Sequence, residues 1–293
     1  MHLDSFRLAS KLSRRAVGCF AVFGSAFFFY LATLIIRWAE PQVTIQSAYF
    51  VFARFLLGFI VVACTMTLKK KCLQPIRYHY LIGRAVANTV AVFCFYKAVA
   101  MGSVAEANIL NMTYPLFVAV FSWLFLREQR DLLSLMIVAV AFTGVWLIVS
   151  PGDIQPSWGN LWGLCSGVTA AAAIIYLNIS RRHHDSQTIL FFMFGIGTVL
   201  MLVFFHDAIF IPDARELFFL LGCSAAGVLG QYLLTYGFLY VTAVEGSIIS
   251  SSRILLAALL GPVLASDPAL TAAGWCGALL IFSANATLAL RKA

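Results

Sequence analysis

The sequence predicts an all-α polytopic membrane protein with ten transmembrane helices arranged around a central cavity. Of its 293 residues, 62% are hydrophobic and only 11% are charged, whereas soluble domains are about 45–50% apolar and about 25% charged. Apolar runs long enough to cross a bilayer, which takes about 20 residues per helix, recur along the chain. Too few charges remain to cover a water-facing surface, so we exclude a soluble globular protein and a disordered chain.

Ten apolar segments are separated by charged or turn-forming residues. They lie at about 16–36, 46–68, 81–101, 104–126, 131–150, 159–180, 187–206, 216–240, 243–265 and 269–290. The first follows Arg7, Lys11, Arg14 and Arg15, as the apolar region of a signal peptide would. It is too long for one and lacks a small-residue cleavage site, so we interpret it as the first transmembrane helix.

Lysine and arginine residues are distributed unevenly over the predicted loops. With a cytoplasmic N-terminus, the inner segments carry fourteen cations and the outer loops carry two, Arg37 and Arg215. The fourteen are Arg7, Lys11, Arg14, Arg15, Lys69, Lys70, Lys71, Arg77, Arg127, Arg130, Arg181, Arg182, Arg291 and Lys292. Because cytoplasmic loops collect cations, we expect both termini in the cytoplasm and a multi-pass location in the cell membrane, the bacterial inner membrane. This bias explains the net charge of +8 without a nucleic-acid partner.

Acidic residues at matching positions indicate an internal repeat. Glu106 and Glu128 are 22 residues apart, as are Glu245 and Asp267, and both pairs obey one offset of 139 residues. We therefore expect two halves of five helices each, 1–150 and 151–293. Five is odd, so the second half is inserted upside down, and inverted repeats of this kind enclose the substrate site of many transporters.

Glu106 and Glu245 have two possible roles. Each follows a hydroxyl residue by three positions, as Ser103-x-x-Glu106 and Thr242-x-x-Glu245. This spacing is typical of a capping box, in which the two side chains satisfy backbone donors at the start of a helix. A glutamate in a membrane protein can also couple transport to protons. Glu128 and Asp267 are interpreted as interfacial charges at helix ends.

Two arginines lie deep inside predicted membrane spans. Arg54 lies eight residues from the outer end of the second span, about 12 Å down, and Arg253 lies near the bilayer centre. A charge at that depth costs about 3 kcal/mol, so each arginine contacts either the substrate or carbonyl groups of neighbouring helices. Arg84 lies closer to the cytoplasmic surface, where its long side chain can reach the interface, and is interpreted as structural. Lys97 is an intermediate case near the outer end.

Polar residues on several spans predict the wall of a binding cavity. Gly246, Ser250, Arg253 and Ala257 share one stripe of the ninth span, and polar residues of the fourth span occupy matched positions. Small residues also permit close helix packing, which is the structural alternative. The predicted substrate-binding residues are Arg54, Asn88, Lys97, Asn108, Asn111, Tyr114, Gln231, Tyr232, Tyr236, Ser250 and Arg253.

Catalytic, metal-binding and cofactor-binding patterns are missing from the sequence. The five histidines fall in loops or at span ends, the seven cysteines form no CxxC pair, and no glycine-rich phosphate loop is present. We therefore expect no metal, no cofactor and no enzymatic activity.

Several short motifs occur in an order that resembles a known family. They include Ala53-Arg54-Phe55-Leu56-Leu57, Tyr114-Pro115-Leu116-Phe117, Leu126-x-Glu128 and Gly144-Val145-x-Leu147-Ile148. Over nearly its whole length the chain resembles the EamA-type, ten-helix branch of the drug/metabolite transporter superfamily. Gly83-Arg84 and Ser252-Arg253 look like the subgroup that contains S-adenosylmethionine carriers and amino-acid or metallophore exporters. The second half departs from the family pattern, since Asp267 stands where Gly-Glu is usual.

The resemblance implies two inverted five-helix repeats that transport small metabolites by alternating access. An interior containing Arg54, Lys97 and Arg253 favours ligands with a negative group. We therefore expect an exporter or exchanger of a small amphoteric or carboxylate-bearing metabolite, such as an amino acid or a compound like S-adenosylmethionine. The alternative is a lipid-handling protein or a membrane-embedded enzyme that uses the same cavity. The expected partners are the metabolite and the lipid bilayer, with the protein as a monomer or homodimer.

Overall fold

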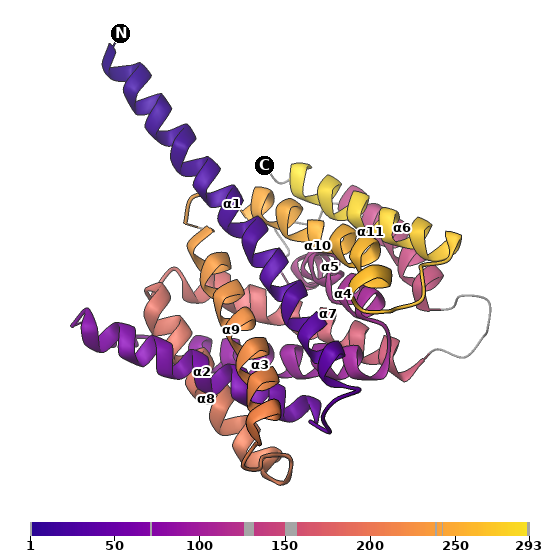
Figure 1. Cartoon of the computed structure of the whole chain (residues 1–293). Coiled ribbons are helices and arrows are strands. Elements are labelled where there is room, and N and C mark those ends of the chain that lie inside the picture. Colours follow the sequence, from indigo (N-terminus) through magenta and orange to yellow (C-terminus); the bar gives the residue numbers. More distant parts are fainter. Residues whose placement is uncertain are drawn as a thin grey trace.

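All the secondary structure described in the computed structural model is helical (Figure 1). The structure describes the backbone of residues 2–70, 72–125, 132–149, 157–237, 239–241 and 243–291, with most side chains from Arg14 onward. The α-helices are α1 (His2–Ala39), α2 (Ser47–Leu68), α3 (Tyr78–Met101), α4 (Val104–Asn111), α5 (Tyr114–Phe125), α6 (Leu132–Val149), α7 (Trp158–Ser180), α8 (Ser186–Phe204), α9 (Ala214–Gly237), α10 (Ala243–Leu264) and α11 (Ala272–Arg291). A 3-10 turn, η2 (His206–Ala208), follows α8.

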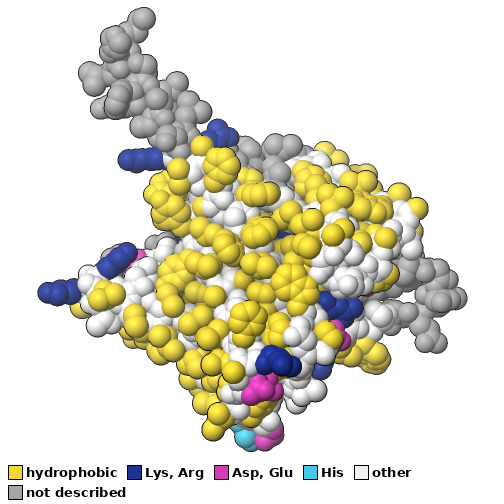
Figure 2. All heavy atoms as spheres, viewed as in Figure 1, with side chains coloured by type: hydrophobic (Ala, Val, Ile, Leu, Met, Phe, Trp, Pro, Cys, Tyr) yellow, Lys and Arg dark blue, Asp and Glu magenta, His cyan; other side chains and the backbone are white. Residues whose placement is uncertain are grey.

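The described helices are suited to a bilayer by length and composition. Seven helical stretches are long and apolar enough to cross a membrane, with α4 and α5 counted as one of them. Three shorter apolar helices, Met136–Ile148, Ile249–Leu264 and Ala272–Thr287, fall in the fifth, ninth and tenth expected spans. Figure 2 shows hydrophobic side chains over most of one face, with small scattered groups of Lys and Arg. The prediction of an all-helical polytopic membrane protein is confirmed.

Helix contacts follow a pattern that a two-fold exchange of the halves would produce. The helix α3 packs along α7, and α1 packs along α9. The third span (α3) corresponds to the eighth (α9), and the sixth span (α7) corresponds to the first (α1). The α3–α7 pair therefore maps onto the α9–α1 pair. The contacts α2 with α9 and α3 with α8 interchange in the same way, whereas α2 with α8 and α6 with α11 map onto themselves. The interfaces therefore join helices of the first half to helices of the second.

The fourth predicted span, 104–126, is interrupted near its middle. The helix α4 ends at Asn111 and α5 begins at Tyr114. Pro115 lacks a backbone N–H and cannot bond the carbonyl of Asn111, which favours an interruption here. Lipid offers no hydrogen bonds to the freed groups, so protein groups must satisfy them. The amide of Asn285 on α11 donates to the Met112 carbonyl at 2.9 Å, and the Thr113 hydroxyl donates to Leu110 O at 2.6 Å.

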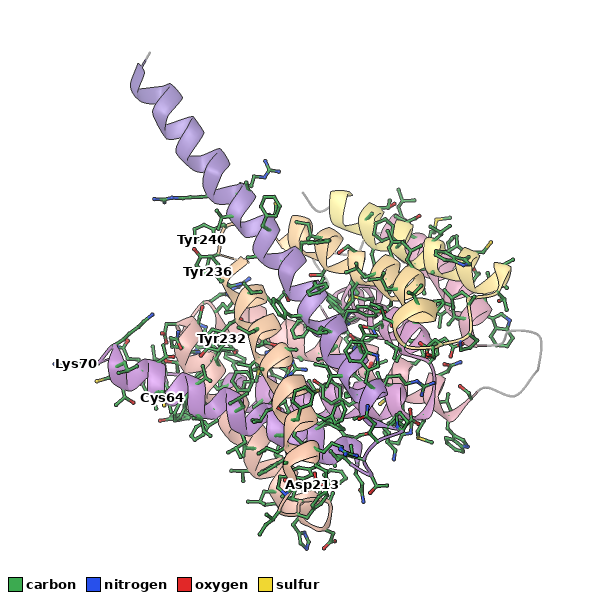
Figure 3. All side chains as sticks on the ribbon, viewed as in Figure 1. Cys64, Lys70, Asp213, Tyr232, Tyr236 and Tyr240 are labelled. Carbon is green, nitrogen blue, oxygen red and sulfur yellow. The ribbon has the colours of Figure 1, made fainter. Side chains whose placement is uncertain are left out.

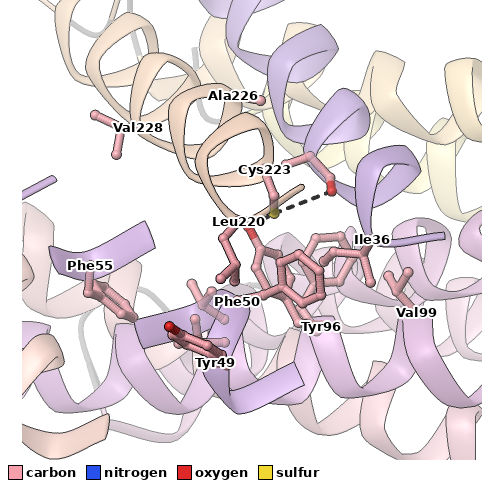
Figure 4. Packing of buried hydrophobic residues seen from close by; sticks show 14 of the residues in the cluster. Ile36, Tyr49, Phe50, Phe55, Tyr96, Val99, Leu220, Cys223, Ala226 and Val228 are labelled. Carbon is pink, nitrogen blue, oxygen red and sulfur yellow. Dashed lines mark hydrogen bonds between the residues drawn. The ribbon is translucent and has the colours of Figure 1, made fainter. Parts of the chain in front are cut away.

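A large hydrophobic cluster joins α1, α2, α3, α8 and α9 beside the broken helix. Figure 4 shows Tyr96 packed among Phe50, Val99, Leu220 and Cys223. The Tyr96 ring is completely buried, and the Cys223 thiol donates a weak hydrogen bond to its hydroxyl over 3.7 Å. This packing fixes one wall of the cavity described next.

Candidate functional site

A cavity of about 110 Å³ lies between the two halves of the chain. Helices α1, α2, α3, α4, α5, α7, α9 and α10 contribute to its wall. Seven of the eleven predicted binding residues line it, namely Arg54, Asn88, Asn111, Tyr114, Gln231, Ser250 and Arg253. The wall also includes Ser25, Phe29, Arg84 and Phe95, none of which was predicted to line it.

Arg253 on α10 reaches the break in the fourth span. Its Nη2 atom donates a hydrogen bond to Oδ1 of Asn111, the last residue of α4. The amide of Asn111 in turn donates to the Ser166 hydroxyl on α7 at 3.0 Å. The guanidinium carbon of Arg253 lies 5.1 Å from the ring centroid of Phe95 and 5.8 Å from that of Phe29. Both rings present π-electrons to a buried cation, which partly offsets its lost hydration.

Arg54 on α2 enters the cavity from another direction. Its Nη1 atom donates to the Tyr96 hydroxyl at 3.0 Å, and its guanidinium carbon lies 5.2 Å from the ring centroid of Phe29. A methyl group on Gly227 of α9 would lie only 2.7 Å from Nε of Arg54. The missing side chain of Gly227 therefore makes room for this guanidinium group.

Several buried donors in the cavity wall have no hydrogen-bond partner among the described residues. They are the Nε atoms of Arg54, Arg84 and Arg253 and the Nδ2 atom of Asn88. Among the residues that the structure describes, the cavity lining includes these three arginines and no aspartate or glutamate. Buried polar groups are costly without a partner, and buried charges more so. The cavity is therefore suited to bind a negatively charged group that accepts hydrogen bonds, such as a carboxylate.

The position of Arg84 differs from the expectation. Arg84 was predicted to be a structural residue whose side chain reaches the cytoplasmic interface. Instead, only 3% of Arg84 is exposed, and the residue lines the cavity. Arg84, Asn88, Ala91 and Phe95 recur at the spacing of one helix face, and all four lie on the cavity wall. The side of α3 on which Arg84 lies, and not its depth, places it inward.

Four predicted binding residues lie outside the cavity wall. Lys97 is about 200° around α3 from Phe95 at 100° per residue, so its helix face points away. The buried amide of Asn108 bonds instead to the Thr33 hydroxyl at 3.1 Å and to Val104 O at 2.8 Å. Tyr232 packs against the hydrophobic cluster. Tyr236 is 46% exposed and packs on Tyr240 at the end of α9 opposite Asp213 (Figure 3).

Two of the acidic residues, Glu106 and Asp267, make capping contacts at the start of α4. The Ser103 hydroxyl accepts a hydrogen bond from the Glu106 backbone at 3.0 Å, and the Glu106 carboxylate lies in reach of Ser103 in return. Asp267, in the loop after α10, was expected to be an interfacial charge, but it is 5% exposed. Its Oδ2 atom accepts from the Ala105 backbone N–H at 3.2 Å. The side chain of Glu245 and the whole of Glu128 lie outside the described residues.

Asp267 therefore joins the second half of the chain to the start of α4 in the first. Its Oδ1 atom also lies 3.5 Å from Nη2 of Arg37, whose other partner is Glu40 at 2.7 Å. Beside it, Nε1 of Trp38 at the end of α1 donates to Leu264 O at 2.6 Å. Burial of the Asp267 carboxyl raises its pKa above the usual range, against the opposing effects of the Ala105 N–H and Arg37.

Comparison with known proteins identifies relatives over most of the chain. It is 29% identical over 206 residues to the pseudopaline exporter CntI of Pseudomonas aeruginosa, an alignment that covers 70% of this chain and 72% of the relative. It is 25% identical to the riboflavin transporter of Rhizobium johnstonii, with 97% and 94% covered. It is 23% identical to human solute carrier family 35 member G1, with 94% and 80% covered.

A solved crystal structure and a family model extend the same relationship. The crystal structure superposes with a TM-score of 0.60 at 17% identity and covers 94% of this chain and 99% of its own, which shows a shared fold. The model of the EamA-like transporter family matches residues 16–150 and again residues 157–289. Two matches that leave only short segments uncovered, together with relatives named as transporters, show that this multi-pass membrane protein belongs to the EamA-like transporter family of the drug/metabolite transporter superfamily.

Proposed function

We propose that the protein is a secondary transporter, an exporter or exchanger, for a small amphoteric or carboxylate-bearing metabolite. Amino acids and compounds similar to S-adenosylmethionine are the expected class. Two relatives are named for small solutes, pseudopaline and riboflavin. The observation that carries the proposal is the set of three arginines, Arg54, Arg84 and Arg253, on a cavity wall whose described residues include no carboxylate.

Arg253 and Asn111 form the centre of the proposed binding site. A carboxylate would displace the neutral Asn111 oxygen from Arg253, because a bidentate pair between guanidinium and carboxylate is stronger than a hydrogen bond to an amide. Release of Asn111 would also loosen the hydrogen-bonded chain that runs from α10 through α4 to α7. Binding at the centre is thereby connected to contacts between the two halves.

We further propose alternating access by relative movement of the halves 1–150 and 151–293. The contacts of Asp267 with Ala105 and of Trp38 with Leu264 hold the outer ends of the two halves together. On the other side, a narrower pocket shares Arg84 and Gln231 with the cavity and continues to Arg181. With the cytoplasmic orientation expected from the loop charges, this arrangement is closed outward, and an exporter would bind its substrate in this state.

The test is a ligand screen of the purified protein combined with two substitutions of Arg253. A thermal-shift screen of amino acids and S-adenosylmethionine identifies the ligand, because a ligand at 100 times its Kd stabilises by about 2.7 kcal/mol. Arg253→Lys keeps the charge but loses the planar fork, and should weaken binding by about 1–3 kcal/mol. Arg253→Ala should weaken it further without lowering the melting temperature, because it removes a buried charge.

The control is Arg182→Lys, an exposed arginine at the expected cytoplasmic end, which should leave affinity unchanged. Unchanged affinity and a lower melting temperature in the Arg253 variants would show that Arg253 is a structural residue. The proposed site would then be wrong.

A further inference from the structure

Arg84 lies between the central cavity and a second, narrower pocket. Both pockets are lined by Arg84, Gln231 and Leu234, and the second has a volume of about 10 Å³. It continues past Leu177 to Arg181 and to Ser186, the first residue of α8. A solute that leaves or enters the cavity by this route must pass the guanidinium of Arg84.

The guanidinium of Arg84 has weaker protein contacts than those of the other two cavity arginines. Arg54 donates to Tyr96 and Arg253 donates to Asn111, and both lie near aromatic rings. The Nε atoms of all three arginines lack a partner, but Arg84 also makes no hydrogen bond through its other nitrogen atoms to any residue that the structure describes. Neither pocket has an aspartate or glutamate among the lining residues that the structure describes.

A structural role at the membrane surface does not explain this position. Arg84 is six residues into α3, about 9 Å from the start of the helix. A side chain that reached the headgroups would be exposed there, but the exposed fraction of Arg84 is only 3%. A cation buried in a membrane protein needs a counter-charge or a polar cavity. Since no described residue of either pocket supplies a negative charge, a ligand can supply it at this end of the cavity.

We propose that Arg84 is a second anion-binding point and that the preferred substrate is an amphoteric molecule with two carboxylates. One carboxylate binds at Arg253, and the other binds at Arg84 on the expected cytoplasmic side. This inference rests on the proposed transport function and narrows its substrate class. It assigns to Arg84 the selection of substrates with two carboxylates over substrates with one.

The experiment compares ligands that differ by one carboxylate. Affinities of purified protein are measured by calorimetric titration for L-glutamate and L-glutamine, for L-aspartate and L-asparagine, and for iminodiacetate and sarcosine. The wild-type protein should bind the dicarboxylate of at least one pair about 10-fold more tightly than its partner. Arg84→Gln should abolish that preference while changing the affinity for the monocarboxylate less than twofold. Arg253→Gln should instead weaken both members of the pair.

Two further variants separate charge recognition from a structural effect. Arg84→Lys should retain part of the preference, because it keeps the positive charge, and it serves where Arg84→Gln fails to fold. Arg77→Gln removes an exposed cation at the same end of α3 and should leave the preference intact.

The outcomes distinguish this inference from the proposed function. If both members of a pair bind equally and Arg253→Gln weakens both, the proposed function stands and the role of Arg84 is refuted. If Arg84→Gln weakens the binding of both members equally, Arg84 acts structurally and its proposed role is refuted. The same holds if Arg84→Lys loses the preference and also has a lower melting temperature. If the wild-type protein binds no member of any pair, the proposed substrate class is wrong and the inference falls with it.

Discussion

Replacing Asp267 should show whether its capping of α4 or its charge pairing holds the outer ends of the halves together. The carboxylate accepts from the Ala105 N–H and lies 3.5 Å from Arg37. Asp267→Asn keeps an oxygen acceptor for the helix but loses the charge. Asp267→Ala loses both. The two substitutions therefore separate the hydrogen bond from the ion pair.

The contacts indicate that the hydrogen bond contributes more. Ala105 is 1% exposed, so an N–H left without an acceptor there costs about 1–3 kcal/mol. The Arg37 side chain is 27% exposed and has Glu40 as an alternative partner, which limits the ion pair to about 0–1 kcal/mol. We expect Asp267→Ala to lower the melting temperature by about 4 °C, at about 2 °C per kcal/mol. Asp267→Asn and Arg37→Gln should each change it by less than about 2 °C.

The pH dependence gives the same comparison a second readout. Burial raises the pKa of Asp267 in the folded protein above its value in the unfolded protein. As pH rises, the Asp267 carboxyl therefore loses its proton at a lower pH in the unfolded state than in the folded state. Stability therefore falls as pH rises through that interval, and the wild-type protein should gain stability relative to Asp267→Asn as pH is lowered from 7 towards 4.

The assay is thermal unfolding of purified protein in detergent. Glu40→Gln is the control, because Glu40 is exposed and its carboxylate pairs with Arg37 without capping a helix, and it should leave the melting temperature unchanged. If Asp267→Asn destabilises as much as Asp267→Ala, the charge and not the cap is what matters, and the reasoning is refuted. A wild-type protein that loses stability relative to Asp267→Asn on acidification would contradict the pKa direction.

Two other predictions concern the cavity wall and the helix break. Gly227→Ala should push the Arg54 guanidinium aside and weaken ligand binding about 10-fold. Gly222→Ala on the same helix is the control and should not weaken binding, because its added methyl group would lie 3.7 Å from the nearest atom. Equal ligand affinities of the two variants in titration would contradict the close approach of Arg54 to Gly227. Asn285→Leu should leave the Met112 carbonyl without its donor and cost about 1–3 kcal/mol. The melting temperature should fall accordingly, and the exposed Ser283→Ala on the same helix should leave it unchanged.

The fold class and the approximate helix positions could be predicted because hydropathy is a local property. A run of about 20 apolar residues forms a helix in a bilayer whatever its neighbours are, since lipid cannot satisfy backbone groups. The depth of Arg253 and Arg54 in their spans could be estimated by counting residues, and both residues line the cavity. The polar residues Asn111, Tyr114 and Ser250 followed from the repeat offset.

The rotation of each helix about its axis could not be predicted in the same way. Lys97 and Arg84 lie on one helix, but Arg84 lines the cavity and Lys97 does not. Which side of α3 faces inward depends on how α3 packs along α7, a contact between distant parts of the chain. A nearly uniform apolar composition around the helix leaves little amphipathic pattern to report that orientation.

The order of residues alone specifies that the chain crosses a membrane many times and that it carries arginines deep within its spans, because both are properties of short segments. Helix packing specifies where those charges meet and where the fourth span breaks. Asn285 supports the break from 173 positions away, and Asp267 caps α4 from 162 positions away. Such bonds form between groups that approach each other after the helices have packed, and no local pattern in the chain specifies them.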